Sequence, residues 1–402
     1  MRRAQQEMAM AAIEEGQGRR FLGALSGPGE IVRQFTPNWF AVTMGTGILA
    51  VALGQFPQSR VLFGTGEALW IANMVLFVGF SALYLARWVL HFDGACRILG
   101  HSSMSMFLGC IPMGLATIVN GFLLFGGAHA GNMAVDIALA LWWVDVALAF
   151  ACGLGVPFLM FTRQTHTIEQ MSAVWLLPVV ACEVVATSGA LLLPQIGDAN
   201  LQLSILMTSY VLWACSVPLA LSIIVILFLR LAIHKLPHAG MAPSSWLALG
   251  PIATGALAMF VLAENGPAVL AASELGTLAT AIGGASFLTG LILWGYGIWW
   301  AVMASLVTAW YFRNPVPFNL GWWAYIFPLG VFALASIKLG DLLALDFIAW
   351  VGGALVAALA LVWIAVIVRT LGQAWQGKLF LAPCLSDDLR VSSCGQDAQT
   401  TR

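Results

Sequence analysis

The sequence predicts an all-α membrane protein: ten transmembrane helices as five helical hairpins with quasi-fivefold symmetry around a central pore. The first observation behind this prediction is composition, because 60% of the 402 residues are hydrophobic and 9% are charged, against about 25% charged in soluble domains. The others are long apolar stretches and a proline or glycine that recurs in alternate stretches. This composition excludes an ordinary cytosolic enzyme and a nucleic-acid binder, which would need clustered Lys and Arg.

A transmembrane helix needs about 20 predominantly apolar residues, and ten stretches of the chain qualify. They cover residues 38–57, 69–91, 104–126, 134–161, 173–194, 202–229, 246–264, 277–310, 318–337 and 344–370. The stretches do not alternate apolar and polar residues as membrane β-strands do. We therefore expect a transmembrane transport domain over 37–372, with cytoplasmic polar tails at 1–36 and 373–402; the first tail lacks the apolar core of a signal peptide.

The distribution of positive charge predicts the orientation of the spans. All Lys and Arg residues except Arg60 and Lys338 fall in the tails or in alternate loops, on one side of the predicted membrane. Cytoplasmic loops carry the excess of Lys and Arg, so both termini are expected in the cytoplasm. The sequence thus predicts a multi-pass protein of the cell (plasma or inner) membrane with an even number of spans.

The odd-numbered spans share a break point that recurs every 66 to 77 residues. Its members are Gly45, Pro112, Pro178, Pro251 and Pro328. Proline removes a backbone hydrogen bond and clashes with the preceding turn, so each odd span should bend in mid-membrane. The longer even spans would lie outside, tilted, and leave a central pathway among the odd ones. The alternative is coincidence, because proline and glycine are common in membrane helices.

One residue directly precedes each break, and equivalent residues of a repeat lie at the same depth. These residues are Met44, Ile111, Leu177, Gly250 and Phe327. If they face the axis, they form an apolar pore constriction that gates by dewetting. The alternative for Phe327 is an ordinary packing aromatic.

Polar side chains near the breaks are candidates for anion contact, because hydroxyl and amide groups can replace part of an anion's water shell. The main candidates are Thr46, Thr117, Asn120 and Thr254, with Thr43, Thr187, Ser188 and Ser336 beside them. The same groups can instead bond to their own helix or hold helices together. Glu183 is either a proton-coupling site or a helix-to-helix hydrogen bond, whereas Asp145 is expected to be structural.

Other chemistry finds no support in the sequence. All six His residues fall at helix ends or in loops, and the seven Cys residues form no CxxC pair. No P-loop, HExxH or nucleophile elbow is present. We therefore predict no catalytic residues, no metal site and no cofactor, and the chain is not expected to be an enzyme.

Three motifs carry a resemblance to a known family. Residues 35–47 (FTPNWFAVTMGTG) resemble the first span of the tellurite-resistance/dicarboxylate transporter family. Residues 111–120 (IPMGLATIVN) are similar to its fungal malate permeases and sulfite efflux pumps. Residues 318–328 (FNLGWWAYIFP) are similar to slow anion channels of the same superfamily. The resemblance implies five hairpins around a central pore, commonly a homotrimer with one pore per subunit, and a gating phenylalanine that maps onto Phe327.

The family's substrates are small inorganic or dicarboxylate anions. On this resemblance we expect sulfite efflux first and transport of malate or another C4-dicarboxylate second, with a chloride- or nitrate-type anion channel as a further alternative. The lipid bilayer is the other expected partner. A membrane enzyme or electron-transfer subunit is disfavoured, because mid-span His pairs for haem ligation are absent. A sensor without transport activity is also possible, although no soluble sensory domain is evident.

Overall fold

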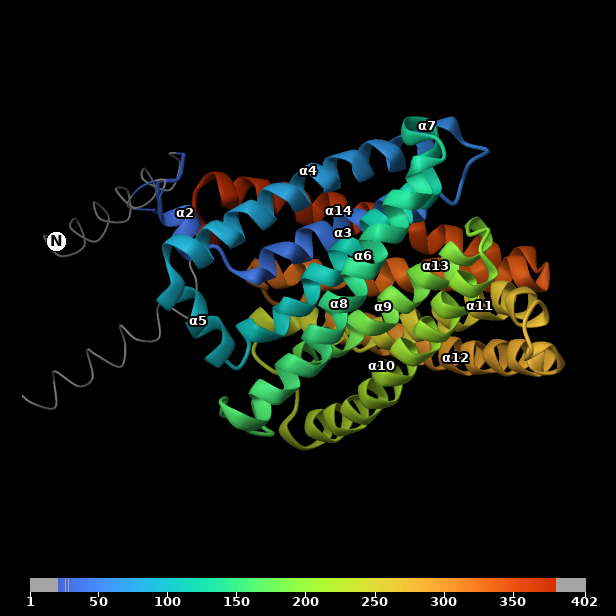
Figure 1. Ribbon diagram of the computed structural model, residues 1–402. Coiled ribbons are helices and arrows are strands. Elements are labelled where there is room, and N and C mark those ends of the chain that lie inside the picture. Colours follow the sequence, from blue (N-terminus) through green and yellow to red (C-terminus); the bar gives the residue numbers. More distant parts are fainter. Residues whose placement is uncertain (1–20, 26, 28, 381–402) are drawn as a thin grey trace, which may run out of the picture.

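The computed structural model describes residues 21–25, 27 and 29–380, and over these residues the protein is helical with no strand. Five short apolar helices carry most of the buried surface: α3 (Phe40–Leu53), α6 (Cys110–Phe125), α9 (Leu177–Leu192), α11 (Leu249–Ala271) and α13 (Ile326–Leu343). Five longer helices alternate with them along the chain: α4 (Arg60–Leu90), α8 (Met133–Thr162), α10 (Ala199–His234), α12 (Ala279–Tyr311) and α14 (Asp346–Trp375). Short helices α2 (Gly29–Gln34), α5 (Phe92–Gly100) and α7 (Gly127–Ala130) lie at the ends of the bundle (Figure 1).

The five short helices contact one another in a closed cycle, in the order α3, α6, α9, α11, α13 and back to α3. Each long helix contacts the short helix before it and the short helix after it, and α14 completes this pattern by contacting α3. We therefore call α3, α6, α9, α11 and α13 the inner helices and the five long ones the outer helices. In Figure 1 the inner helices run along the bundle with α4, α8, α10 and α12 on its outer faces.

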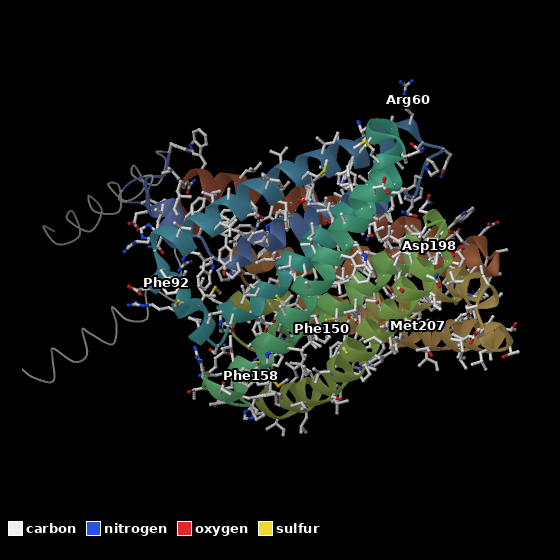
Figure 2. The ribbon with its side chains drawn as sticks, viewed as in Figure 1. Arg60, Phe92, Phe150, Phe158, Asp198 and Met207 are labelled. Carbon is white, nitrogen blue, oxygen red and sulfur yellow. The ribbon has the colours of Figure 1, made fainter. Side chains whose placement is uncertain are left out.

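Burial separates the two sets of helices. Between 61 and 94% of the most apolar window is buried in the spans that contain α6, α9, α11 and α13, against 17 to 33% in the outer helices. Large apolar side chains of the outer helices, including Phe150, Phe158 and Met207, lie on the surface of the bundle (Figure 2). These exposed apolar side chains suit a surface that faces lipid, because soluble monomers rarely expose large contiguous apolar patches.

Nine helices of the described residues are long and apolar enough to cross a membrane. The predicted first span is shorter than expected, because its helical part covers only Pro37–Leu53, about 25 Å at 1.5 Å per residue. Every residue of α3 is buried, so this helix is covered by protein along its length. The second span begins at Arg60 rather than at residue 69, and α11 continues to Ala271 with Pro267 inside it. The predicted tails lie largely outside the described residues.

The prolines at the recurring break points mark the starts of α-helices and not bends in mid-helix. Each inner helix is preceded by a 3-10 segment: η1 (Pro37–Trp39), η2 (Met104–Gly109), η3 (Ala173–Leu176), η5 (Ala239–Trp246) and η7 (Leu320–Tyr325). The four break prolines occupy the second or third residue of the α-helix that follows. Proline is tolerated in the first turn, where its missing N–H has no intrahelical partner to lose. The prolines thus mark where 3-10 geometry changes to α geometry.

The inner helices approach closely where one of them presents a glycine. A Cβ at Gly45 would lie 2.6 Å from the Trp323 ring, and one at Gly330 would lie 2.8 Å from Ile48. Both contacts join α3 to the η7–α13 segment, where the last inner span meets the first. Absence of a side chain allows backbones to pack at van der Waals distance, as is common between membrane helices.

Buried arginines fasten loops at the end of the bundle where Phe92 is labelled, opposite Arg60 and Asp198 (Figure 2). Arg87 donates hydrogen bonds to the carbonyl oxygens of Phe35 and Gly94. Arg230 binds the carbonyl oxygens of Glu169 and Lys235. Each guanidinium binds carbonyl oxygens of two separate segments of the chain and so ties these segments to an outer helix.

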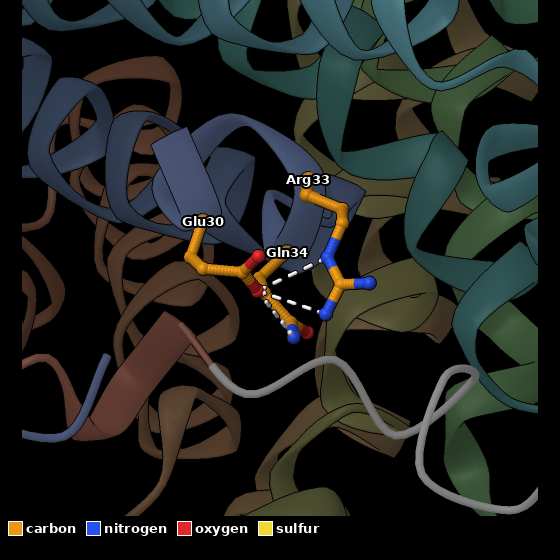
Figure 3. Close-up of polar contacts among 3 residues, drawn as sticks. All are labelled: Glu30, Arg33 and Gln34. Atoms are coloured by element: carbon orange, nitrogen blue, oxygen red, sulfur yellow. Dashed lines mark hydrogen bonds and ion pairs between the residues drawn. The ribbon is translucent and has the colours of Figure 1, made fainter. Parts of the chain in front are cut away.

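At the same end, α2 is stabilised by its own side chains. Glu30 forms an ion pair with Arg33 at 2.9 Å and accepts a longer hydrogen bond from Gln34 at 3.4 Å (Figure 3). This short helix contacts α4 and η8 (Lys378–Phe380), the last described segment. The two described ends of the chain therefore lie together on one side of the bundle.

Replacing Gly109 by alanine should destabilise the protein, because the new Cβ would lie 2.8 Å from Pro178 Cα and closer still to the Leu177 carbonyl group. Neither neighbour is a flexible side chain, so the backbones must separate, at a cost of about 2 kcal/mol. The measurement is the thermal unfolding midpoint of purified protein in detergent. Gly155→Ala in α8, where a Cβ meets open space, is the matched control and should leave the midpoint unchanged or raised; equal midpoints for the two variants would refute this packing role.

Candidate functional site

A cavity of about 380 Å³ opens where the 3-10 segments of the inner spans meet. All five inner spans contribute to its wall, together with the segment that follows α14. Its central lining residues are Ala41, Met44, Phe107, Cys110, Val174, Leu177, Leu247, Leu320 and Ala324. The cavity is on the side of the bundle where the inner helices begin, which is also the side of both described chain ends.

The floor of the cavity coincides with the start of the α-helical segments. Met44 and Leu177 line it directly before the break of their span, and Cys110 lines it two residues before Pro112. Leu177 is the first residue of α9 and Cys110 the first of α6. The chain beyond these residues is densely packed, and the deeper halves of the inner helices contribute no residue to the cavity wall.

The five predicted constriction residues are therefore placed differently from one another. Met44 and Leu177 line the cavity, whereas Ile111, Gly250 and Phe327 do not. Phe327 is 3% exposed and belongs to the main apolar cluster. Gly250 lies beside α13, with only Pro328 Cγ near the position of a Cβ, at 3.8 Å. Phe327 therefore belongs to the packed interior of the bundle and not to the cavity wall.

The electrostatic character of the cavity favours a negatively charged occupant. Of the described residues that line it, none is Asp or Glu, and the bases are His238 and Lys378. The first turns of α6 and α9 lie at its floor. Helix N-termini carry partial positive charge. Polar side chains of Asn38, Ser103 and Asn319 supply further donors at the rim.

The hydroxyl groups predicted as anion contacts are mostly engaged with protein. Thr46 accepts a hydrogen bond from Trp363 of α14 at 3.2 Å. Thr117 accepts one from Asn73 of α4 at 3.2 Å and donates to Gly114 O at 2.7 Å. Both side chains thus join an inner helix to an outer one. The remaining hydroxyls bond to the backbone of their own helix: Thr43, Thr187, Ser188 and Ser336.

Two of the candidates keep unpartnered buried oxygens within the described residues. Thr254 Oγ1 in α11 neither donates nor accepts a hydrogen bond there, and Asn120 Oδ1 in α6 accepts none. Neither residue lines the cavity. An unpaired buried polar group is costly and usually has a partner or a function.

The buried acids lie between helices. Glu183 is fully buried in α9, and its Oε2 is 3.6 Å from the position of a Cβ on Gly255 of α11. Val217 of α10 and Leu293 of α12 border the same position. The carboxyl group therefore lies behind the wall formed by α9 and α11, where the Ser216 hydroxyl of α10 is a polar neighbour. That hydroxyl donates to Val179 O at 2.8 Å, so the carboxyl oxygens accept no hydrogen bond from the described residues. Asp145 of α8 is likewise buried and without a partner there.

The opposite end of the bundle carries one ion pair between inner helices. Lys338 Nζ of α13 contacts Glu264 Oε2 of α11. Lys338 is the only Lys or Arg within the five inner helices, and Glu264 compensates its charge. Fixed positive charge is thus available at the cavity end rather than deep in the inner helices.

Sequence reasoning missed the polar rim of the cavity, because it concentrated on the spans. Asn38, Ser103, Ser244 and Asn319 all line the cavity and lie seven to nine residues before the break of their span. This common offset was the available signal. Lys378 and Gln373 had no such signal, because only tertiary structure brings the last turn of α14 and the segment after it to the cavity.

Comparison with known proteins gives a family match over most of the chain. Residues 34–371 match the model of the SLAC1 family, described as voltage-dependent anion channel. The chain is 35% identical over 356 residues to a protein of Arthroderma benhamiae named sulfite efflux pump, covering 87% of this chain and 93% of that protein. It is 25% identical over 325 residues to the malic acid transport protein of Schizosaccharomyces pombe, covering 78% and 72%. An uncharacterized transporter of Methanocaldococcus jannaschii is 28% identical over 358 residues, covering 87% and 96%.

Proposed function

This chain belongs to the SLAC1 family and transports anions across a membrane, and on that premise we propose that its physiological activity is sulfite efflux. The observation that carries the proposal is the 35% identity to a sulfite efflux pump over nearly the whole of both chains. The cavity supports it, because a space without carboxylates, at the N-termini of inner helices, suits a small oxyanion. The family and the relatives are channels and transporters rather than enzymes.

Transport of a C4-dicarboxylate such as malate is the alternative, favoured by the likeness to the malic acid transport protein. A chloride- or nitrate-type channel is the third candidate, in keeping with the description of the family. The size of the cavity, about 380 Å³, leaves room for any of these anions.

We propose a ten-span arrangement for the transport domain, 37–372, with both termini in the cytoplasm of a cell-membrane protein. Five hairpins, each an inner helix and the outer helix after it, would surround a quasi-fivefold pore, and the cyclic contacts of the inner helices support this view. In this arrangement the cavity is the cytoplasmic vestibule of the pore. A homotrimer with one pore per subunit is part of the same proposal.

We propose Phe327 as the gate of this pore. It directly precedes Pro328 at the start of α13 and is buried outside the cavity wall. A buried aromatic ring in the path of an anion would present an unwetted barrier, which the anion cannot cross without losing its hydration. Gly250 on the neighbouring inner helix α11 offers the space into which the ring could turn, since its Cβ position meets only Pro328.

Competitive flux tests the choice of substrate. Purified protein in liposomes should transport sulfite, and sulfite efflux should exceed malate and chloride flux at equal concentration. Protein-free liposomes supply the background. Preference for malate would replace sulfite by the dicarboxylate alternative, and preference for chloride would favour the channel alternative. No flux with any of the three anions would contradict the transport proposal.

Phe327→Ala should raise anion flux by about tenfold, as expected when a barrier falls by about 1.4 kcal/mol. The matched control is Phe332→Ala, because Phe332 is also a buried phenylalanine of α13 but packs on Trp294 of the outer helix α12, with ring centroids 6.3 Å apart. The control should lower thermal stability without raising flux. Unchanged or reduced flux in correctly inserted Phe327→Ala protein would exclude the gate.

Glu183→Gln should flatten the dependence of flux on pH if this carboxyl group carries protons, because the amide keeps the shape but cannot titrate. Flux is measured in liposomes over a pH series. Asp145→Asn is the control, since Asp145 is an equally buried acid on the outer helix α8, and it should keep the wild-type profile. An unaltered profile in Glu183→Gln would leave Glu183 with a structural role only.

A further inference from the structure

The end of α14 turns back toward the cavity at one glycine. Gly377 has φ of +79°, in the left-handed region that favours glycine. The next residues form η8, Lys378–Phe380, and the Phe380 ring stacks on Trp39 with centroids 4.7 Å apart. Trp39 is the last residue of η1, directly before inner helix α3. The turn at Gly377 therefore attaches the chain end to the rim of the cavity.

The N-terminal side of the chain holds this turn in place. Leu22 N donates to Trp375 O at 2.8 Å, and Ala24 N donates to Gln376 O at 3.1 Å. A Cβ on Gly377 would lie 3.3 Å from Leu22 Cα, which leaves little space for any other residue. Backbone contacts on one side and the Trp39–Phe380 stack on the other thus position Lys378.

Lys378 is the one lysine or arginine among the described residues that line the cavity. Within the same part of the chain it forms no ion pair, and no carboxylate lines the cavity to neutralise it. Its side chain is exposed, so the ammonium group keeps its hydration and can exchange partners. An exposed cation at the mouth of a largely apolar cavity raises the local concentration of anions.

We propose that Lys378 is an anion-binding residue of the cavity, which recruits the transported oxyanion at the cytoplasmic mouth and sets the concentration at which transport half-saturates. The inference rests on the proposed function for the identity of the ligand, a small mono- or divalent oxyanion. The inner helices carry no unpaired cation deeper in the bundle, because Lys338 is paired with Glu264. Binding at the mouth can therefore be weakened separately from passage through the pore.

The test compares Lys378→Gln with Lys378→Arg in the full-length protein. Sulfite-dependent flux is measured in liposomes with sulfite added to one face at a time. Lys378→Gln should raise the half-saturating sulfite concentration by about three- to tenfold, the scale of one screened charge contact, for sulfite added to the face that bears the chain ends. Lys378→Arg, which keeps the charge, should stay near wild type. The difference should shrink in high sodium gluconate, because salt screens the contact.

Lys235→Gln is the matched control, because Lys235 is another exposed lysine in the loop between α10 and η5 but does not line the cavity. It should leave half-saturation unchanged. Equal half-saturation in Lys378→Gln and wild type, or an equal rise in Lys235→Gln, would overturn the inference while leaving sulfite transport in place.

A binding measurement separates this inference from the proposed function. Tryptophan fluorescence of the detergent-purified protein is titrated with sulfite, since Trp39 stacks directly on Phe380. Weaker binding in Lys378→Gln than in Lys378→Arg supports the site even if the wild-type protein transports no sulfite. Binding of equal strength in both variants contradicts the site, whatever the flux. Equal thermal unfolding midpoints of the two variants are expected, because the exposed side chain has no ion-pair partner in the part of the chain that the structure describes.

Discussion

The structure depends on close packing among five short apolar helices that bury one another instead of facing lipid. Their backbones approach at glycines, such as Gly109 against Leu177 and Gly330 against Ile48, where even a methyl group would separate the helices. Because α3 is wholly covered by protein, it can be shorter than a bilayer-spanning helix. The outer helices then provide the apolar surface that meets the membrane, and Trp–hydroxyl bonds such as Trp363–Thr46 join the two layers.

The same packing produces the cavity. Each inner span starts as a 3-10 segment, and the four spans that carry a break proline change to α-helix within three residues of it. The cavity lies among the 3-10 segments and the first turns of the α-helices. Helix N-termini and polar residues therefore surround a space that no carboxylate of the described residues lines. In the proposed function, partial charges and Lys378 attract the anion, and this favours weak binding and release over tight capture.

Much of the helical architecture was predictable from composition and spacing. Runs of apolar residues predicted the outer helices α8, α10, α12 and α14 to within a few residues, and the register Gly45, Pro112, Pro178, Pro251, Pro328 identified which spans lie inside. Thr46 and Thr117 show the limit of such reasoning. The sequence around a threonine in an apolar helix is the same whether its side chain faces a pathway or accepts a hydrogen bond from Trp363 or Asn73. Helical spacing does not reveal which neighbouring helix packs against each face.

By itself, the sequence determined the membrane class, the alternation of short and long helices and the family, because hydrophobicity and local backbone chemistry act over a few turns of helix. Only the tertiary structure decided that the prolines start α-helices, that Met44 and Leu177 reach the cavity while Phe327 is buried outside its wall, and that Lys378 lines the cavity. These depend on contacts between residues far apart in the chain, such as Phe380 with Trp39. Such contacts are selected by packing and carry no signature in local sequence.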